Sequence, residues 1–379
     1  MVIYFSFVIP VIVTIVLLMF FRYKTQWWEI AVLMGFSVLF VLFCKLISVS
    51  SLTSDTEWLG GYVTDVRYYE PWDEEVSCRH PVYCTDPCGS KDDKGNCSST
   101  TYQCGNEHLY DVDYHSEYWE AVTTLGDYGI SENRYEQLVR QFGTGKHFVE
   151  MNRDYHSIDG NQYRCDYGGE DEKLEPVTEP HTYENRPMVS NSIYKYDAVD
   201  TFDIREYKPF EYPEITNLWR QKVLLGHNNP KLEQRIQVLN SRLGKSKQIR
   251  IFFLVFKNQT REAGFIQERY WQGGNKNELI VCVNLDQANK VTWGHVISWT
   301  DETAVKVKLK HKIEDNKDVT LDEIVNTVEE EINTDWVRKP FKDFDYLNIE
   351  PTTTQVVWIL ILTLLVNVGI AIWIVLNEH

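Results

Sequence analysis

Three long apolar runs constrain this chain more than any other feature. Residues 2–21 carry no charge, residues 30–48 carry one lysine near their far end, and residues 356–376 are again uncharged. About 20 apolar residues in a helix cross the hydrocarbon core of a bilayer. Trp358 and Trp373 lie towards the two ends of the third run, where aromatic side chains favour the membrane interface. The sequence therefore predicts three transmembrane helices.

The first run has one alternative interpretation, a cleavable signal peptide. Its apolar stretch is longer than the apolar region of such peptides, no basic segment precedes it, and no small-residue cleavage site follows it. The sequence favours a permanent anchor.

Basic residues near the predicted spans indicate the orientation of the chain. The connector between the first two spans holds Arg22 and Lys24, whereas residues 48–58 and 343–355, next to the other span ends, hold no Lys or Arg. Cytoplasmic loops are enriched in Lys and Arg, so residues 49–354 are expected on the non-cytoplasmic side. Three basic residues slightly further from the third span argue against this orientation.

The region between the spans is acidic. It contains all but two of the 55 Asp and Glu residues and all but three of the 38 Lys and Arg residues. The resulting negative electrostatic potential disfavours binding of nucleic acids and anionic lipid surfaces. It suits binding of cations or basic partners, or simply keeps the protein soluble. Length and composition predict an α+β protein in four parts. These are a helical hairpin (1–48), a strand-rich part with cysteines (49–213), an α/β sandwich (214–345) and a linker with the third span (346–379).

Six cysteines lie in the strand-rich part: Cys78, Cys84, Cys88, Cys97, Cys104 and Cys165. An even number outside the cytoplasm predicts three disulfides, and the polar, turn-like segment between Cys88 and Cys97 suits a local loop. One alternative is that the cysteines are free thiols. The stronger alternative is a metal site, because histidines lie among the cysteines and zinc accepts mixed ligands. Its candidate ligands are Cys78, His80, Cys84, Cys104 and His115. No paired C-x-x-C motif is present, so disulfides are favoured, and zinc or another divalent cation remains the alternative cofactor.

A second candidate site follows the cysteines. Asp111, Asp113 and His115 alternate along an expected strand, which places all three side chains on one face. Such a row can bind a cation or act as acid and base, although a solvated strand face is the commoner case. Further on, Ser131 is expected to cap a short helix over 131–141, and residues 166–190 read as a surface loop. No nucleophile elbow, zinc-protease or nucleotide-binding motif occurs in this part.

The distal part has clearer periodicity. Helices are expected over 229–243, with Gly244 as a stop, over 261–272 and over 322–332. Strands are expected over 249–256, 278–285, 290–299 and 304–313, the last from strict alternation of apolar residues and lysines. This order of elements predicts an α/β sandwich.

The distal part resembles the TPM domain, a module of thylakoid-lumen phosphatase-like proteins, a photosystem repair factor and a receptor-accessory protein. The resemblance rests on residues 249–256, 263–271, 279–283 and 291–299, and on Gly274 with Asn275 and Asn277. Asn277-Glu278 stands where the family has Asn-Gly, and Ser298-Trp299-Thr300 replaces its glycine-rich turn, so no metal or phosphatase site is carried over. Through YYEPW, YHSEYW and GNKNEL the whole chain is also similar to uncharacterised membrane proteins of tailed phages and bacteria, a resemblance that implies no activity.

These observations favour a membrane-anchored, non-enzymatic interaction or assembly protein with an acidic ectodomain. Its expected partners are the bilayer and another protein, not nucleic acid. The alternative is a membrane-tethered, metal-dependent hydrolase of the phosphatase type. The string GNKNEL (274–279) remains open between a ligand-binding turn and a plain helix-to-strand turn, with the plain turn favoured.

Overall fold

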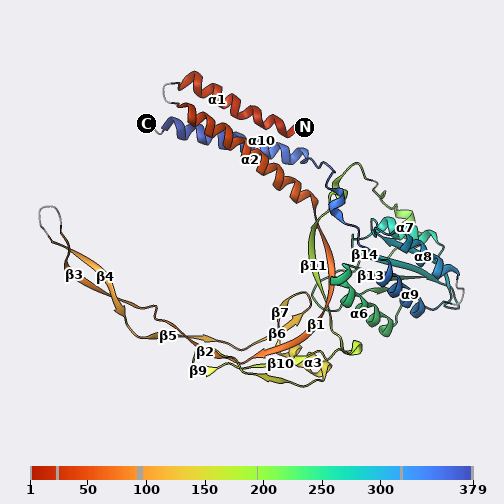
Figure 1. Cartoon of the computed structure of the whole chain (residues 1–379). Coiled ribbons are helices and arrows are strands. Elements are labelled where there is room, and N and C mark those ends of the chain that lie inside the picture. The colour runs from red at the N-terminus through yellow and green to blue at the C-terminus, as the bar shows by residue number, and fades with distance from the viewer. Residues whose placement is uncertain (1, 23–24, 92–96, 194, 316–318, 377–379) are drawn as a thin grey trace.

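The computed structural model describes residues 2–22, 25–91, 97–193, 195–315 and 319–376. Among these residues, three helices are long and apolar enough to cross a membrane. They are α1 (Val8–Phe20, extended by the 3-10 helix Val2–Phe7), α2 (Trp27–Thr53) and α10 (Thr353–Leu376). The three helices lie side by side, apart from the mixed helix-and-sheet part of the chain (Figure 1). The prediction of three apolar helices in a membrane protein is confirmed.

The three helices pack through a few buried side chains. Leu33 and Ile374 are buried at one end of the bundle, and Val41 and Ile359 at the other. Between them, the buried Ser37 hydroxyl donates to Asn367 Oδ1 at 2.8 Å. Most other apolar side chains of these helices are exposed, as expected for a surface that faces lipid.

The long strand β1 (Ser54–Tyr69) follows α2 directly and organises the first sheet. Its first half pairs with β11 (Pro176–Glu184), and its second half pairs on both edges, with β6 (Tyr118–Thr123) and β10 (Gln162–Asp166). All of these pairs are antiparallel, and the partners change at a bulge near Val63. Strands β7 (Asp127–Ile130) and β8 (His147–Val149) extend the sheet.

Helices α3 (Glu132–Phe142) and α6 (Pro230–Lys247) both pack against this sheet, and α3 belongs to the same part of the chain. Helix α3 begins after Ser131, whose hydroxyl accepts the Arg134 N–H, and it buries Tyr135, Leu138 and Phe142. The predicted helix is therefore confirmed. The expected loop over 166–190 is wrong in part, because β11 lies within it. The first half of β1 needs a hydrogen-bonding partner, and β11 supplies it.

The second sheet has the order β12-β13-β14-β15. Strands β12 (Leu224–Leu225), β13 (Arg250–Lys257) and β14 (Glu278–Leu285) are parallel, and β15 (Val291–Ser298) is antiparallel. The helices around this sheet are α6 (Pro230–Lys247), α7 (Glu262–Tyr270), α8 (Thr303–Asp315) and α9 (Leu321–Thr334). Helix α7 packs against His295 of β15, whereas α8 packs against Gly294 on the opposite face. The shorter elements of the chain are Asp171–Lys173, α4 (Arg186–Val189), α5 (Thr201–Tyr207) and Phe341–Phe344.

Two local predictions for this part are wrong. Residues 304–313 form helix α8, not a strand. Val305, Leu309 and Ile313 are buried at helical spacing, whereas Val307, which strand alternation would bury, is 55% exposed. Gly244 does not end α6, which continues to Lys247. A side chain at Gly244 would place its Cβ only 2.3 Å from the carbonyl oxygen of Gly60, so the glycine permits α6 to approach β1 closely.

An extended arm leaves the first sheet and projects away from the second (Figure 1). The arm consists of residues 72–115. It contains β2 (Trp72–Ser77), β3 (Pro81–Lys91), β4 (Cys97–Asn106) and β5 (Tyr110–His115), with β9 (Tyr155–Asp159) alongside β2. Strands β2 and β5 pair with each other, and beyond them β3 and β4 form an outer hairpin.

Candidate functional site

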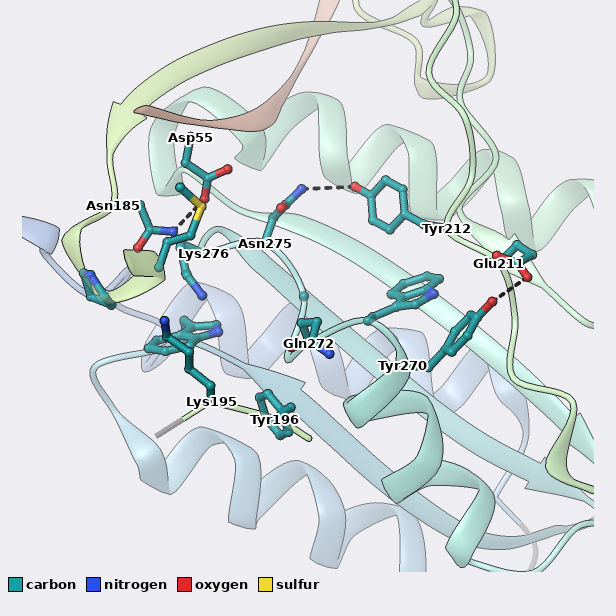
Figure 2. Close-up of a pocket in the computed structure, with 15 residues that line it drawn as sticks. Asp55, Asn185, Lys195, Tyr196, Glu211, Tyr212, Tyr270, Gln272, Asn275 and Lys276 are labelled. Atoms are coloured by element: carbon teal, nitrogen blue, oxygen red, sulfur yellow. Dashed lines mark hydrogen bonds between the residues drawn. The ribbon is translucent and has the colours of Figure 1, made fainter. Parts of the chain in front are cut away.

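A pocket of about 640 Å³ lies where β1 begins, beside the turn that connects α7 to β14. Its walls come from segments far apart in the sequence, and they include Asp55, Asn185, Lys195, Tyr212, Tyr270, Lys276 and Trp299. Figure 2 shows Asp55, Asn185 and Lys276 towards one end, and Tyr212, Tyr270 and Glu211 towards the other.

Lys276 is the notable group of this pocket. Its side chain is buried, with 8% of the residue exposed, and its Nζ lies 3.5 Å from the centre of the Trp299 ring. Among the described residues, no hydrogen bond or ion pair reaches this amine. Burial lowers the pKa of Lys276 to about 8, against the opposing effect of Asp55 and Glu278. The pocket therefore holds a cation without a hydrogen-bonded anion.

The turn that carries Lys276 is held by a buried network. Gly273 and Gly274 both have positive φ angles, which glycine adopts without strain. The buried carboxylate of Glu278 accepts from the Asn275 N–H at 2.8 Å and from the Tyr212 hydroxyl at 2.6 Å. Burial raises the pKa of Glu278, although the guanidinium of Arg250 opposes that shift. The network fixes the turn, and none of its hydrogen bonds involves the Lys276 amine.

Asp55 supplies a negative charge at the same end of the pocket as Lys276 (Figure 2). It lies near the start of β1, directly after α2, and its Oδ2 accepts from the Tyr183 hydroxyl at 2.9 Å and from Asn185 Nδ2 at 2.6 Å. Its carboxylate is thus already satisfied. An ammonium over an aromatic ring suits a small ligand that joins an anionic group to an apolar or planar part.

The cysteines are only partly paired as expected. In the described part of the chain, Cys84 bonds to Cys104 and Cys88 bonds to Cys97. The expected local loop between Cys88 and Cys97 is confirmed. The prediction of a third disulfide is wrong, because Cys78 and Cys165 are free. Cys165 is fully buried on β10 in the core of the first sheet, whereas Cys78 lies in the arm.

The predicted metal ligands are separated by this pairing. Cys84 and Cys104 are bonded to each other, and His115 lies elsewhere, 2.9 Å from a Glu74 oxygen and stacked on Trp72. Cys78 and His80 do come together, with two residues absent from the predicted set. In the resulting group of Cys78, His80, His108 and Asp111, one ligand atom from each residue lies within 4.8 Å of the others.

The sequence held a usable signal for the two missed ligands. His108 and Asp111 follow the end of the outer hairpin, whereas Cys78 and His80 precede its start. Closing the hairpin brings these ends together, and the Glu107 N–H donates to the His80 carbonyl at 2.9 Å. The spacings C-x-H and H-x-x-D at the two ends of one hairpin would have indicated the group.

The row of Asp111, Asp113 and His115 lies on one face of β5, where Arg79 engages both aspartates and Glu74 pairs with the histidine. Asp111 accepts from the Arg79 N–H at 2.6 Å and pairs with His108, while Asp113 pairs with the Arg79 guanidinium. The Arg79 N–H, followed by His108, lowers the pKa of Asp111 to about 2. The row does not converge on one shared opening.

No protein-family model, curated protein or solved structure matches the chain.

Proposed function

We propose that this chain is a membrane-anchored, non-enzymatic interaction protein whose arm binds a basic protein partner. The observation that carries the proposal is that the arm has no apolar core of its own among its described residues. Its described residues contribute no buried apolar side chain, although the arm holds four strands and two disulfides. Ordering the backbone costs about 1–2 kcal/mol per residue, which folded proteins offset mainly by burying apolar surface. An arm ordered without a core of its own is well suited to bury its surface against a partner.

The surface chemistry of the arm supports this function. Leu109 is 89% exposed, and the large side chains Tyr83, Tyr102 and Tyr114 are exposed as well. Tyrosine is enriched at protein interfaces because it offers much contact area at a small entropic cost. The sequence of the arm contains nine Asp and Glu residues against three Lys and Arg residues. This charge suits a basic partner, and it opposes association of two copies of a chain whose net charge is −17.

The proposal includes the membrane topology. If α1, α2 and α10 all cross the bilayer, both ends of the ectodomain are anchored on one membrane face. The two disulfides and the basic connector support the non-cytoplasmic face, because disulfides persist in oxidising compartments. Anchoring at both ends restricts the directions in which the arm can point.

Photo-crosslinking in native membranes tests the partner. A photoreactive residue at Leu109 or Tyr83 is expected to give one discrete adduct, and added salt is expected to weaken it. The matched control is Phe202, an exposed aromatic residue on α5, outside the arm. The proposal fails if the arm positions give no adduct, if Phe202 gives the same one, or if the only adduct is a dimer of this chain.

Labelling with a membrane-impermeant thiol reagent tests the topology. A cysteine in place of the exposed Tyr346, near the start of α10, should react from the non-cytoplasmic side. One in place of Thr25, in the connector, should react only from the cytoplasmic side. The opposite pattern, judged against the unsubstituted chain, rejects the proposed orientation.

A second candidate function, binding of a small anionic ligand, is favoured by the unengaged amine of Lys276. Inorganic phosphate and benzoate are suitable first probes. At a concentration of one hundred times its Kd, a ligand stabilises the folded chain by about 2.7 kcal/mol. This stabilisation should be absent in Lys276→Met and present in Lys257→Met, a lysine exposed at the end of β13. Equal stabilisation of both variants would exclude Lys276 as the ligand-binding group.

The hydrolase alternative has less support, since Arg79 already engages Asp111 and Asp113, and His115 pairs with Glu74. A phosphatase screen of the full chain, with and without divalent cations, tests it directly. Activity that depends on the cation and is lost in Asp113→Ala would favour the hydrolase over the interaction protein.

A further inference from the structure

We infer that Cys78, His80, His108 and Asp111 form a structural zinc site at the base of the outer hairpin. Their ligand atoms already lie within 4.8 Å of one another. Zinc binds sulfur at about 2.3 Å and nitrogen or oxygen at about 2.0–2.2 Å, so tetrahedral ligand atoms are roughly 3.3–3.8 Å apart. Two contacts are at or below that spacing: Asp111 Oδ1 is 3.3 Å from His80 Nδ1 and 2.5 Å from His108 Nε2. Small side-chain rotations complete the geometry.

The fold brings the four ligands together at a break in the arm. The inner ladder of β2 and β5 ends at the pair Ser77 and Tyr110, and the outer ladder of β3 and β4 begins at the pair Pro81 and Asn106. Cys78, His80 and His108 lie in this break, and Asp111 is the second residue of β5, paired with Val76. A metal bound there would join the two segments where no regular strand pairing does.

The chemistry of the ligands selects zinc over harder cations. One thiolate and two imidazoles are poor ligands for calcium and magnesium, which prefer oxygen. The thiolate of Cys78 and the carboxylate of Asp111 together balance the two positive charges of the ion. The guanidinium of Arg79 pairs with Asp113 and so does not compete for the Asp111 carboxylate. Four protein ligands fill a tetrahedral ion and leave no position for a substrate, so the site is structural.

The zinc site also accounts for an otherwise unexplained thiol. Cys78 is free and only partly buried, although two disulfides lie in the adjacent outer hairpin. An accessible thiolate attacks neighbouring disulfides and reshuffles them. Zinc coordination removes this reactivity, and the bound ion would fix the direction of the outer hairpin relative to β2 and β5.

Metal analysis of the full chain, purified in detergent, tests the inference. We expect one zinc per chain. Substitution with cobalt should give tetrahedral absorption bands together with a thiolate-to-cobalt charge-transfer band. Cys78→Ser should abolish the charge-transfer band. His108→Ala should weaken zinc binding by at least roughly 100-fold, because loss of a group beyond the ligands already costs 10–100-fold.

Two controls separate the site from adventitious binding and from misfolding. His115→Ala removes a nearby histidine outside the group and should retain the zinc. Thiol counting shows whether each variant still forms its two disulfides, and hence a folded hairpin. The inference is overturned if the wild-type chain binds no zinc, if its cobalt complex lacks the thiolate band, or if His115→Ala loses zinc as readily as His108→Ala. The crosslinking test is independent, since an arm without zinc can still bind a partner.

Discussion

Replacing Arg338 with methionine should destabilise the ectodomain strongly, because it leaves a fully buried carboxylate without its cation. Glu57, on β1, has no exposed surface. Arg338 Nη2 lies 2.9 and 2.7 Å from its two oxygens, and His181 Nδ1 lies 2.9 Å from Oε1. Removing one partner of a buried ion pair costs about 3–5 kcal/mol. Because His181 remains as a hydrogen-bond partner, we expect a loss near the lower end, about 3 kcal/mol.

A double-mutant cycle isolates the effect of the stranded charge. In Arg338→Met combined with Glu57→Gln, the buried group is neutral. The double variant should therefore be more stable than Arg338→Met alone, with a coupling energy of at least about 2 kcal/mol. Lys339→Met is the matched control, because Lys339 pairs with Asp301 at the surface and such pairs contribute about 0–1 kcal/mol.

Unfolding of the full chain in detergent, followed by tryptophan fluorescence, measures these differences. A loss of 3 kcal/mol corresponds to a decrease in Tm of about 6 °C, at about 2 °C per kcal/mol for a large domain. The reasoning is refuted if Arg338→Met costs no more than Lys339→Met, or if the double variant is no more stable than the single one. The pair matters structurally because it joins β1, which follows α2, to the segment that leads to α10.

Three further predictions concern the pocket, the helix contact and the hairpin. Lys276→Met should stabilise the chain by about 3 kcal/mol at pH 7, because the pKa of Lys276 near 8 in the folded state, against an ordinary value of 10.5, means that folding disfavours its charged form. This gain should shrink as the pH rises from 8 to 10.5, and denaturant unfolding at several pH values measures it. Gly244→Ala should lower the free energy of unfolding by about 1–3 kcal/mol despite alanine's higher helix propensity, whereas Gly35→Ala, whose Cβ would meet nothing within 4 Å, should not. Replacing Cys88 and Cys97 with serine should cost about 2–3 kcal/mol locally, which limited proteolysis should detect as cleavage in the outer hairpin with little change in the Tm of the α/β part.

The elements that depend on local pattern were predictable from the sequence. The strand predicted over 278–285 is confirmed as β14, and the strand predicted over 249–256 overlaps β13 almost completely. The failure at α8 has a physical cause. Val305 and Leu309 fit both a strand and a helix, and only the exposure of Val307 separates the two. Tertiary packing of α8 against Gly294 decides the outcome, and no local pattern contains that contact.

The pairings between distant segments could not be predicted from the sequence. β11 reads as a loop because its residues are acidic and include proline, and its partner β1 lies more than 100 residues earlier. The pocket also depends on contacts between segments that are far apart in the sequence. The string GNKNEL was recognised as a candidate turn, but Lys276 is buried only because Trp299 and the start of β1 close over it. The spacings of Cys78 with His80 and of His108 with Asp111 are visible in the sequence, but joining the two pairs into one group requires the closure of the outer hairpin.

Strand β1 connects the two proposed binding regions, and its pairing indicates how they influence each other. Asp55 of the pocket lies near its start, and the arm begins at Trp72, shortly after its end. At about 3.3 Å per residue the strand separates them by roughly 50 Å. Over Asp65–Tyr69 it is hydrogen-bonded on both edges, and at Gly60 it is in tight contact with α6. Coupling between distant sites requires an element that can adopt two arrangements. A strand hydrogen-bonded on both edges cannot shift to a second arrangement without breaking its pairing. Phosphate or benzoate bound at Lys276 should therefore leave the crosslinking yield at Leu109 unchanged, and a change in that yield would show that β1 moves.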